Sequence, residues 1–388
     1  SVAVSGTTAT VTLTKSAATS VYDTMVEALQ YKNTHQDPST GNSRVVTLTE
    51  IVDSGSNAGS NDNVSALSIA STVTLAATND APTATAGTTL AYSENGTAAV
   101  VDNTIALSDA DDSQMAGASV TISSGFTSGD ILTFTDTANI TGSYNSGSGV
   151  LTLSGSDTTA NYQAALRSIT YASSSEDPTT TATSRTISWT VTDGNSDGAG
   201  AETSTAVTST INLTAVNDAP VTTAGATLAY SENGTAAVID NTIALSDIDD
   251  SQMAGASVTI SSGFTSGDTL GFTTIGAISG SYNSSTGVLT LSGTDTIANY
   301  QAALRSITYA SSSEDPTATA ASRTISWSVT DANSDGAGAQ SSSAVTSTIN
   351  LTATNDTPTA TAGATLAYSE NGTAAVVDNT IALSDADD

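Results

Sequence analysis

Paired asparagine and aspartate residues recur along this 388-residue chain at a constant interval. Asn79-Asp80, Asn217-Asp218 and Asn355-Asp356 stand 138 residues apart, and a proline follows two positions after each aspartate. Proline fixes φ and has no N–H to give to a sheet, so it suits the start of a new folded unit better than the interior of a strand. We interpret the three pairs as joints between successive units, and call them the first, middle and third joints.

Four acidic clusters repeat with the same period as the joints. In the first complete unit they are Glu94, then Asp109, Asp111 and Asp112, then Glu176 and Asp177, and finally the loop Asp193-x-Asn195-x-Asp197-Gly198. Like charges that are brought together repel one another unless protons or a cation intervene. Ca²⁺ takes oxygen ligands, mostly carboxylates, carbonyls and waters. These residue types therefore predict a calcium site wherever the clusters meet.

The composition excludes several classes of function. Seven Lys and Arg residues face 38 Asp and Glu, a net charge of −31, which argues against nucleic acid or anionic lipid as a partner. The chain has no cysteine and one histidine, His35, so a Cys nucleophile or a repeated Ser-His-Asp triad cannot form, and we expect no enzyme activity. No apolar run approaches the roughly 18 residues of a membrane span, so we expect no membrane insertion in this segment.

The elements that would position the acids are short strands. Val, Ile, Leu and Tyr alternate with Ser and Thr in runs separated by Gly, Ser and Asn turns, a pattern typical of an all-β sandwich. Between 158 and 170, Tyr162, Leu166 and Ile169 stand at helical spacing and predict a short helix that crosses the end of the sandwich. Trp189 and Trp327 fall in mid-strand and are expected in the core. The runs in the first complete unit cover 90–93, 98–101, 104–107, 118–122, 131–134, 140–144, 150–153, 185–191 and 207–213.

The period also predicts how the chain is divided. We expect the C-terminal part of a diverged repeat in 1–80, complete repeats in 81–218 and 219–356, and the N-terminal part of a further repeat in 357–388. The first part keeps the marker Asp37-Pro38, which matches Asp177-Pro178. Tandem units of this kind usually form elongated arrays, so we expect a rod that is a segment of a longer protein.

The strand order decides where the clusters lie. With an up-and-down order, the turn of Asp109 and the loop of Asp193 lie at the end that faces the preceding joint. The loop of Glu176 and Asp177 then lies at the opposite end, near the next joint. Carboxylates from two neighbouring repeats are therefore expected to converge at every joint.

The pattern resembles a cadherin-type repeat, and more closely the cadherin-like tandem repeats of giant bacterial cell-surface and adhesin proteins. The stretch Tyr162-Gln-Ala-Ala-Leu-Arg-Ser-Ile-Thr-Tyr171 is the part most similar to the bacterial repeats. The resemblance implies tandem Ig/cadherin-like sandwiches that bind Ca²⁺ between domains. Its ligands come from a first-strand Glu, an acidic loop, an Asn-Asp linker, an Asp-x-Asp motif and a later Asp of the next domain.

Carried onto this chain, the resemblance implies one ligand set for each joint. The Glu-Asp-Pro loop departs from the Asp-Arg-Glu of cadherins and the linker has fewer acids, which leaves the number of ions per joint open. The sets are Asp37, Asn79, Asp80, Asp109, Asp111 and Asp193 for the first joint; Glu94, Glu176 or Asp177, Asn217, Asp218, Asp247, Asp249 and Asp331 for the middle joint; and Glu232, Glu314 or Asp315, Asn355, Asp356, Asp385 and Asp387 for the third.

Three other interpretations of the acids stay open. The carboxylates could serve only solubility and the protection of strand edges. Arg167 or Arg185 could pair with Glu176 or Asp177 and remove it from the ligand set. The loop that begins at Asp193 matches the first half of an EF-hand loop, but strands flank it and its twelfth position is a serine, so it could close only a local ion site.

These expectations lead to one function and two alternatives. The first is a calcium-rigidified stalk of a large secreted bacterial adhesin, located at the cell surface, which extends a distal functional domain and whose partners are its own neighbouring repeats or surface ligands. The alternative is a structural subunit that assembles with like chains into an extracellular filament or surface layer. A glycan-binding module would need exposed aromatic platforms, which a chain with 4% aromatic residues hardly offers.

Overall fold

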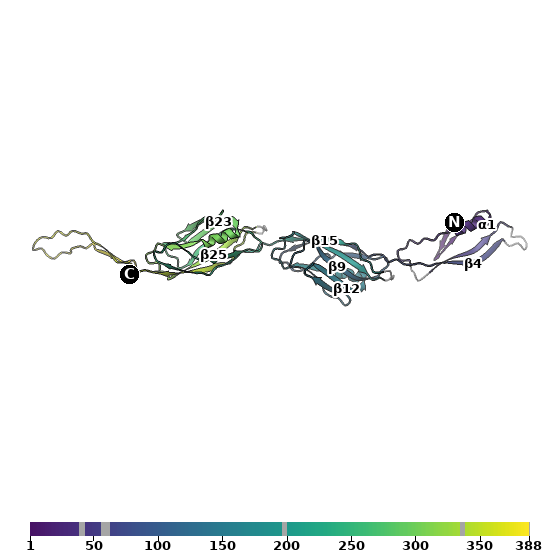
Figure 1. The fold of residues 1–388 in the computed structure, drawn as a ribbon, viewed down its shortest axis with the longest axis horizontal. Coiled ribbons are helices and arrows are strands. Elements are labelled where there is room, and N and C mark those ends of the chain that lie inside the picture. The colour runs from purple at the N-terminus through teal and green to yellow at the C-terminus, as the bar shows by residue number, and fades with distance from the viewer. Residues whose placement is uncertain (39–42, 56–62, 196–199, 334–337, 388) are drawn as a thin grey trace.

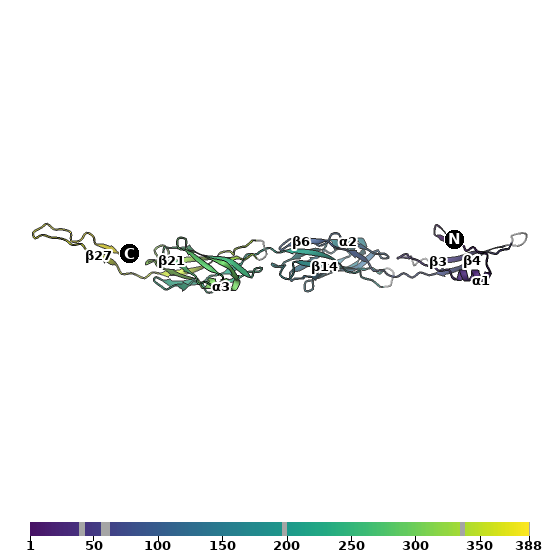
Figure 2. The ribbon, with the colours of Figure 1, turned by 90° about the horizontal axis from the view of Figure 1, so that it is seen from above.

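The chain forms a rod in the computed structural model, which describes residues 1–38, 43–55, 63–195, 200–333 and 338–387. Two β-sandwiches occupy the middle of the rod, with the N-terminal residues at one end and the C-terminal residues at the other (Figure 1). Turned by 90° about the long axis, the rod remains narrow (Figure 2). The predicted fold class, all-β with tandem sandwiches, is confirmed, whereas the division at residues 81, 219 and 357 stays a prediction.

A six-stranded sheet forms one layer of the first sandwich, in the order β11-β12-β9-β14-β15-β6. Neighbouring strands are antiparallel except for β6, which runs parallel to β15. The strands are β6 (Thr89–Ser93), β9 (Gln114–Ser124), β11 (Thr141–Asn145), β12 (Val150–Thr158), β14 (Ser184–Asp193) and β15 (Val207–Thr214). The order is therefore not the simple up-and-down arrangement that we assumed from the sequence, because the first long strand returns to pair with the last.

Two smaller sheets complete the first sandwich, with the orders β10-β13-β7 and β5-β8. Side chains from the six-stranded and three-stranded sheets pack into one core, in which Trp189, Val120, Tyr171 and Leu132 are at most 1% exposed. The predicted core position of Trp189 is confirmed, as is that of Trp327 in the second sandwich. The strands of these sheets are β5 (Thr83–Thr85), β7 (Ala99–Val100), β8 (Ala106–Ser108), β10 (Asp130–Thr133) and β13 (Thr170–Ser173).

Strand β14 shows why this sequence folds as a half-buried sheet. Its inward side chains, from Arg185 to Asp193 at every second residue, are buried, and the Ser and Thr residues between them are partly exposed. Successive side chains of a strand point to opposite faces, so one run supplies both the core and a hydroxyl-rich outer surface. The same alternation places Asp193, a predicted ligand, at the end of the strand with its side chain buried.

The predicted helix is α2 (Thr159–Arg167), which connects β12 to β13 and so crosses from one layer to the other. Thr158 caps its first turn by accepting a hydrogen bond from the Asn161 N–H at 3.2 Å. Tyr162, Ala165 and Leu166 are buried, which is the apolar side that their spacing predicted. None of the described helices is long and apolar enough to cross a bilayer.

The second sandwich repeats this plan, and its six-stranded sheet has the order β17-β26-β25-β20-β23-β22. Its elements are β16 (Val221–Thr223), β17 (Thr227–Ser231), β18 (Ala237–Val238), β19 (Ala244–Ser246), β20 (Gln252–Ser262), β21 (Asp268–Gly271), β22 (Ser279–Asn283), β23 (Val288–Thr296), α3 (Ile297–Arg305), β24 (Thr308–Ser311), β25 (Ser322–Asp331) and β26 (Val345–Thr352). Equivalent joints are therefore built from equivalent strand ends.

The two ends of the chain contain fewer elements than the sandwiches. The N-terminal part comprises β1 (Val2–Ser5), β2 (Thr8–Val11), α1 (Thr19–Glu27), β3 (Arg44–Val52) and β4 (Val64–Val73), and the C-terminal part comprises β27 (Thr359–Thr361) and β28 (Ala382–Ser384). The helix α1 precedes the antiparallel pair β3-β4, whereas α2 is followed first by β13 and then by the antiparallel pair β14-β15. The N-terminal part therefore contributes a strand-end loop to the first joint.

Candidate calcium centres at the joints

Glu94 is a buried carboxylate at the middle joint, at the end of β6. It follows directly on β6, and its backbone N–H donates to the Thr214 carbonyl at 2.9 Å. Its Oε2 accepts a hydrogen bond from the Val216 N–H at 2.8 Å, while the side chain is only 4% exposed and Oε1 has no partner among the described residues. A buried carboxylate oxygen without a donor is costly unless a cation or a proton satisfies it.

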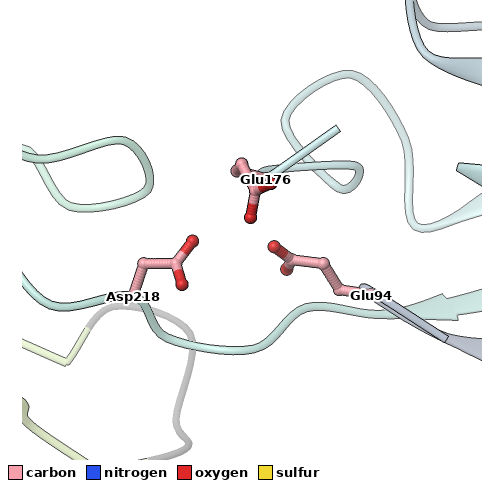
Figure 3. Close-up of side chains that lie close together, drawn as sticks. All are labelled: Glu94, Glu176 and Asp218. Atoms are coloured by element: carbon pink, nitrogen blue, oxygen red, sulfur yellow. The ribbon is translucent and has the colours of Figure 1, made fainter. Parts of the chain in front are cut away.

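Two further carboxylates lie beside Glu94, and each comes from a different part of the joint. Glu176 belongs to the loop before β14, and Asp218 belongs to the linker itself (Figure 3). One carboxylate oxygen from each of the three residues lies within 4.8 Å of the other two. The Asn95 side chain donates to Glu176 Oε2 at 3.1 Å, which orients that carboxylate.

The crowding of negative charge shows in the titration of these groups. Burial, followed by the neighbouring charges of Asp218, Glu176 and Asp249, raises the pKa of Glu94 to about 7, although the Val216 N–H opposes the shift. Burial and the same neighbours, Asp249 and Glu176, raise the pKa of Asp218. Asp249 belongs to the following repeat, so the charges of both repeats act on one site.

The following repeat contributes a second group of carboxylates to the middle joint. The Asp218 N–H donates to Asp249 Oδ2 at 2.7 Å, which ties the linker to the turn after β19. Asp247 Oδ1 accepts from the N–H groups of Asp249 and Asp250 at 3.2 and 3.0 Å, and one oxygen from each of the three lies within 4.8 Å of the others. Burial and the contact with Asp249 raise the pKa of Asp247 to about 7.

Asn217 connects the linker to the end of β25. Its side-chain amide donates to Asp331 Oδ2 at 2.9 Å, while its own Oδ1, in a side chain 1% exposed, has no hydrogen-bond partner among the described residues. Asp331 is fixed by the N–H groups of Asn333 and Gln340, and the Gln340 side chain donates to the Asn217 carbonyl. The arrangement leaves the amide oxygen of Asn217 as a buried potential ligand.

At the third joint, the carboxylates of the preceding repeat and the linker are arranged as at the middle joint. Glu232 Oε2 accepts from the Thr354 N–H at 2.8 Å, and Glu232, Glu314 and Asp356 each place an oxygen within 4.8 Å of the others. The Asp356 N–H donates to Asp387, whose own N–H donates to Asp385 Oδ1 at 3.0 Å. The predicted Asn355 donates to the Asp356 carbonyl at 2.9 Å.

At the first joint, the residues of the linker and of the following repeat are arranged as at the middle joint, but those of the preceding part differ. Asn79 donates to Asp193 Oδ2 at 2.8 Å, the Asp80 N–H donates to Asp111 Oδ2 at 2.9 Å, and the Asp111 N–H donates to Asp109 Oδ1 at 3.1 Å. From the preceding part, Gln36 donates to Asp80 Oδ2 at 3.0 Å, in the place where the other joints have a glutamate. Gln36 was not among the residues singled out from the sequence.

The structure separates two residue types that the sequence left as alternatives. Glu176 and Glu314 face the joints, whereas Asp177 accepts hydrogen bonds from Thr179 and Thr180 within its own loop. Asp315 likewise accepts from Thr317. Asp37 occupies the position of Asp177, and its N–H donates to His35 Nδ1 at 3.1 Å. The clusters described at the middle and third joints thus contain the glutamates of these loops and not Asp177 or Asp315.

Several expectations about neighbouring residues need correction or stay open. Arg185 does not remove Glu176 from the cluster: its guanidinium pairs with Asp130 at 2.6 Å, deep in the core, and Arg167 donates to the Ile105 carbonyl. Asp250 belongs to the acidic cluster recognised in the sequence but not to the ligand set implied by the resemblance, and the structure groups it with Asp247 and Asp249. The local ion site in the loop after Asp193 depends on Asp197 and Gly198, which lie outside the described residues.

The donor set at the joints fits a hard divalent cation. Carboxylate and amide oxygens supply all the side-chain atoms gathered here, and Glu94 Oε1, Asn217 Oδ1 and Asp247 Oδ2 are buried without hydrogen-bond donors in the part of the chain that the structure describes. Oxygen-only ligands suit Ca²⁺ or Mg²⁺ better than a soft metal. A site drawn from strand ends and a linker, with carboxylates that carry several charges, is typical of Ca²⁺ more than of Mg²⁺.

Comparison with known proteins gives one partial sequence match and several structural ones. No protein-family model matches the chain. Halomucin of Haloquadratum walsbyi (strain DSM 16790 / HBSQ001) is 35% identical over 128 residues, which is 31% of this chain, and this chain spans about 1% of halomucin's length.

Solved structures similar to the chain are cadherin extracellular domains. They include the cis-dimer structure of protocadherin gammaB7 EC3-6, at 16% identity over 87% of this chain and 67% of that one, with a TM-score of 0.34. Another is human CDH23 EC21-23, at 13% identity over 77% of this chain and 83% of that one, with a TM-score of 0.30.

Proposed function

We propose that this chain is a segment of an extracellular stalk whose joints are stiffened by Ca²⁺. The observation that carries the proposal is the meeting of Glu94, Glu176 and Asp218, with an oxygen of buried Glu94 left without a donor. Glu94, Glu176 and Asp218 bring three carboxylates together in a chain that has 38 Asp and Glu against seven Lys and Arg. A cation at the joint would offset the repulsion between the two repeats.

The chain's own residues prepare the site. The Val216 N–H holds Glu94, Asn95 holds Glu176, and the N–H groups of Asp249 and Asp250 hold Asp247. Bound Ca²⁺ would supply positive charge and a common ligand for groups on both sides of the linker. At the middle joint the proposed ligands are Glu94, Glu176, Asn217, Asp218, Asp247, Asp249, Asp250 and Asp331.

The remaining parts of the proposal concern context. Extracellular calcium modules bind with dissociation constants of about 10⁻⁴ to 10⁻³ M, a range that fits a secreted or surface protein better than a cytosolic one. We place the stalk at a bacterial cell surface as part of a large adhesin, where it extends a distal functional domain. The chain then acts by its length and stiffness and is not an enzyme.

One observation favours the alternative, a subunit that assembles laterally with like chains. The outer face of the six-stranded sheet carries hydroxyl side chains in register: Ser143 lies opposite Thr152, Thr152 opposite Ser119, and Ser119 opposite Thr190. This face is uncharged along that row in a chain of net charge −31, so like chains could approach there without strong repulsion.

Calorimetric melting of the full chain in EDTA and in 10 mM Ca²⁺ tests the proposal. We expect Ca²⁺ to raise the melting temperature, because a ligand that binds only the folded state at about a hundred times its dissociation constant adds about 2.7 kcal/mol per site. The double variant Asp247→Asn and Asp249→Asn should lose the part of the rise that belongs to the middle joint.

The control removes two charges far from the middle joint, at exposed Glu27 and Glu50, by changing both to Gln. This variant should keep the full rise in melting temperature. An equal melting temperature of the unaltered chain in EDTA and in Ca²⁺ would mean that the carboxylates serve solvation, and the proposal would fall.

A further inference from the structure

The loop that faces the first joint from the preceding part corresponds to the glutamate loops of the other joints. Gln36-Asp37-Pro38 matches Glu176-Asp177-Pro178 in sequence. The match holds in structure, because Arg44 donates to the Pro38 carbonyl at 3.3 Å as Arg185 donates to the Pro178 carbonyl at 2.7 Å. Gln36 is therefore the counterpart of Glu176.

The exchange of glutamate for glutamine changes the chemistry of the position. Gln36 Nε2 donates to Asp80 Oδ2 at 3.0 Å, so the amide occupies an oxygen whose counterpart in the middle joint belongs to Asp218. Glu176 instead brings a negative carboxylate to within 4.8 Å of Asp218 and Glu94. The glutamine thus removes one charged ligand and satisfies part of a second.

The other half of the first joint is still built for a ligand. Asn79 is 4% exposed, and its Oδ1 has no hydrogen-bond partner among the described residues, as with Asn217 at the middle joint. Asp80 and Asp193 are held in the same way as Asp218 and Asp331. On the side of the preceding part, the first joint has Gln36 in place of Glu176, and the position 138 residues before Glu94 lies ahead of residue 1, so this chain brings no counterpart of Glu94 to the first joint.

We infer that Gln36 makes the first joint bind Ca²⁺ more weakly than the middle joint, so that the rod stiffens in two steps as Ca²⁺ rises. The inference rests on the proposed function, because it concerns the same kind of site. Calcium affinity depends strongly on the number of charged oxygen ligands, and we expect an amide at position 36 in place of a carboxylate to weaken binding at the first joint about tenfold. At Ca²⁺ concentrations that fill the middle joint but not the first, the rod would bend at the first joint and be straight at the middle one.

Single-molecule energy transfer across each joint of the full chain tests the inference. The chain has no cysteine, so dyes can be placed on two engineered pairs at exposed positions. Thr47→Cys with Ser154→Cys reports on the first joint, and Ser154→Cys with Ser292→Cys reports on the middle joint. Calcium should narrow the distance distribution of the middle pair at about tenfold lower concentration than that of the first pair.

Matched exchanges at the two equivalent positions identify the cause. Gln36→Glu should lower several-fold the Ca²⁺ concentration at which the distance distribution of the first dye pair narrows, and should leave that of the middle pair unchanged. Glu176→Gln should raise the Ca²⁺ midpoint of the middle pair. Coincident midpoints in the unaltered chain, or no shift with Gln36→Glu, would overturn this inference alone. If neither pair responds to Ca²⁺, the proposed function falls and this inference falls with it.

Discussion

At the scale of single residues, the joints depend on carboxylates that are held close together in spite of their charge. Glu94 is fixed by one backbone donor, while its second oxygen faces Glu176 and Asp218 (Figure 3). Such a site has two ways to relieve repulsion: a proton or a metal ion. Without a cation, only protonation can relieve the repulsion, so the stability of the metal-free chain depends on pH.

We predict that the metal-free chain loses stability as pH rises from about 5 to 8. The pKa of Glu94 is raised from its ordinary value of 4.5 to about 7 in the folded state, so its stabilising proton is fully present below pH 4.5 and is lost as pH passes 7. The loss should be on the order of 2 kcal/mol for this group. Urea unfolding in metal-free buffer at several pH values measures it.

The variant Glu94→Gln provides the comparison. It should reduce the pH dependence of the unfolding free energy by the share of Glu94 and leave the share of Asp247, whose pKa is also raised to about 7, whereas Glu27→Gln, at an exposed helical position, should leave it unchanged. A parallel pH dependence in the unaltered chain and the Glu94→Gln variant would show that this carboxylate is not the group that titrates.

At the scale of elements, an irregularity in β12 directs the chain into α2. The register of β12 against β9 shifts between Ser154 and Asp157, and Gly155 there has a φ of 118°. The Gly155 carbonyl accepts a hydrogen bond from the Tyr162 hydroxyl, so the bulge is tied to the helix. A bulge of this kind re-aims the chain, and it needs a residue without a Cβ.

We predict that Gly155→Ala destabilises the first sandwich by about 3 kcal/mol or more, because strain and overpacking add. A Cβ at this position would lie 1.9 Å from the Asn139 carbonyl oxygen. Gly147→Ala, in the turn between β11 and β12, meets only the Asn145 side chain at 3.3 Å and should cost much less. Denaturant unfolding of both variants measures the difference, and equal losses would contradict it.

The sequence predicted the elements well and their partners poorly. Alternation of apolar and hydroxyl residues is a local signal, and it located β14 and the helix near Tyr162. The pairing of Arg185 with Asp130 joins residues 55 apart and leaves no local trace, so the alternative that Arg185 pairs with Glu176 or Asp177 did not anticipate it. The return of β6 to β15 was also invisible, because a pattern shows which face is buried and does not show which strand lies beside it.

At the scale of the whole molecule, repetition made the joints predictable. A period of 138 residues places equivalent acids at both ends of every sandwich, so their convergence followed even though the assumed strand order was wrong. What the period could not show was the choice of Glu176 over Asp177, which depends on hydrogen bonds from Thr179 and Thr180 inside the loop. It also could not show that Gln36 contacts Asp80.

We predict that the full chain sediments as an elongated monomer in 10 mM Ca²⁺. Its net charge of −31 opposes association in solution, and its elements are arranged along one axis (Figure 1). Analytical ultracentrifugation over a range of concentrations distinguishes the two functions. Growth of ordered polymers with concentration would favour the filament subunit, and Ser119→Asp with Thr190→Asp on the hydroxyl row should then suppress them.

The parallel pairing of β6 with β15 decides how a sandwich responds to being pulled by its two joints. The chain enters through the short strand β5, continues into β6 and leaves after β15, and β6 and β15 run in the same direction with Thr89 opposite Thr210 and Ser93 opposite Thr214. Tension along the rod therefore slides one strand past the other. The hydrogen bonds of this ladder must yield together in shear, not one after another as in a zipper, so each sandwich resists extension at the strands through which the force passes.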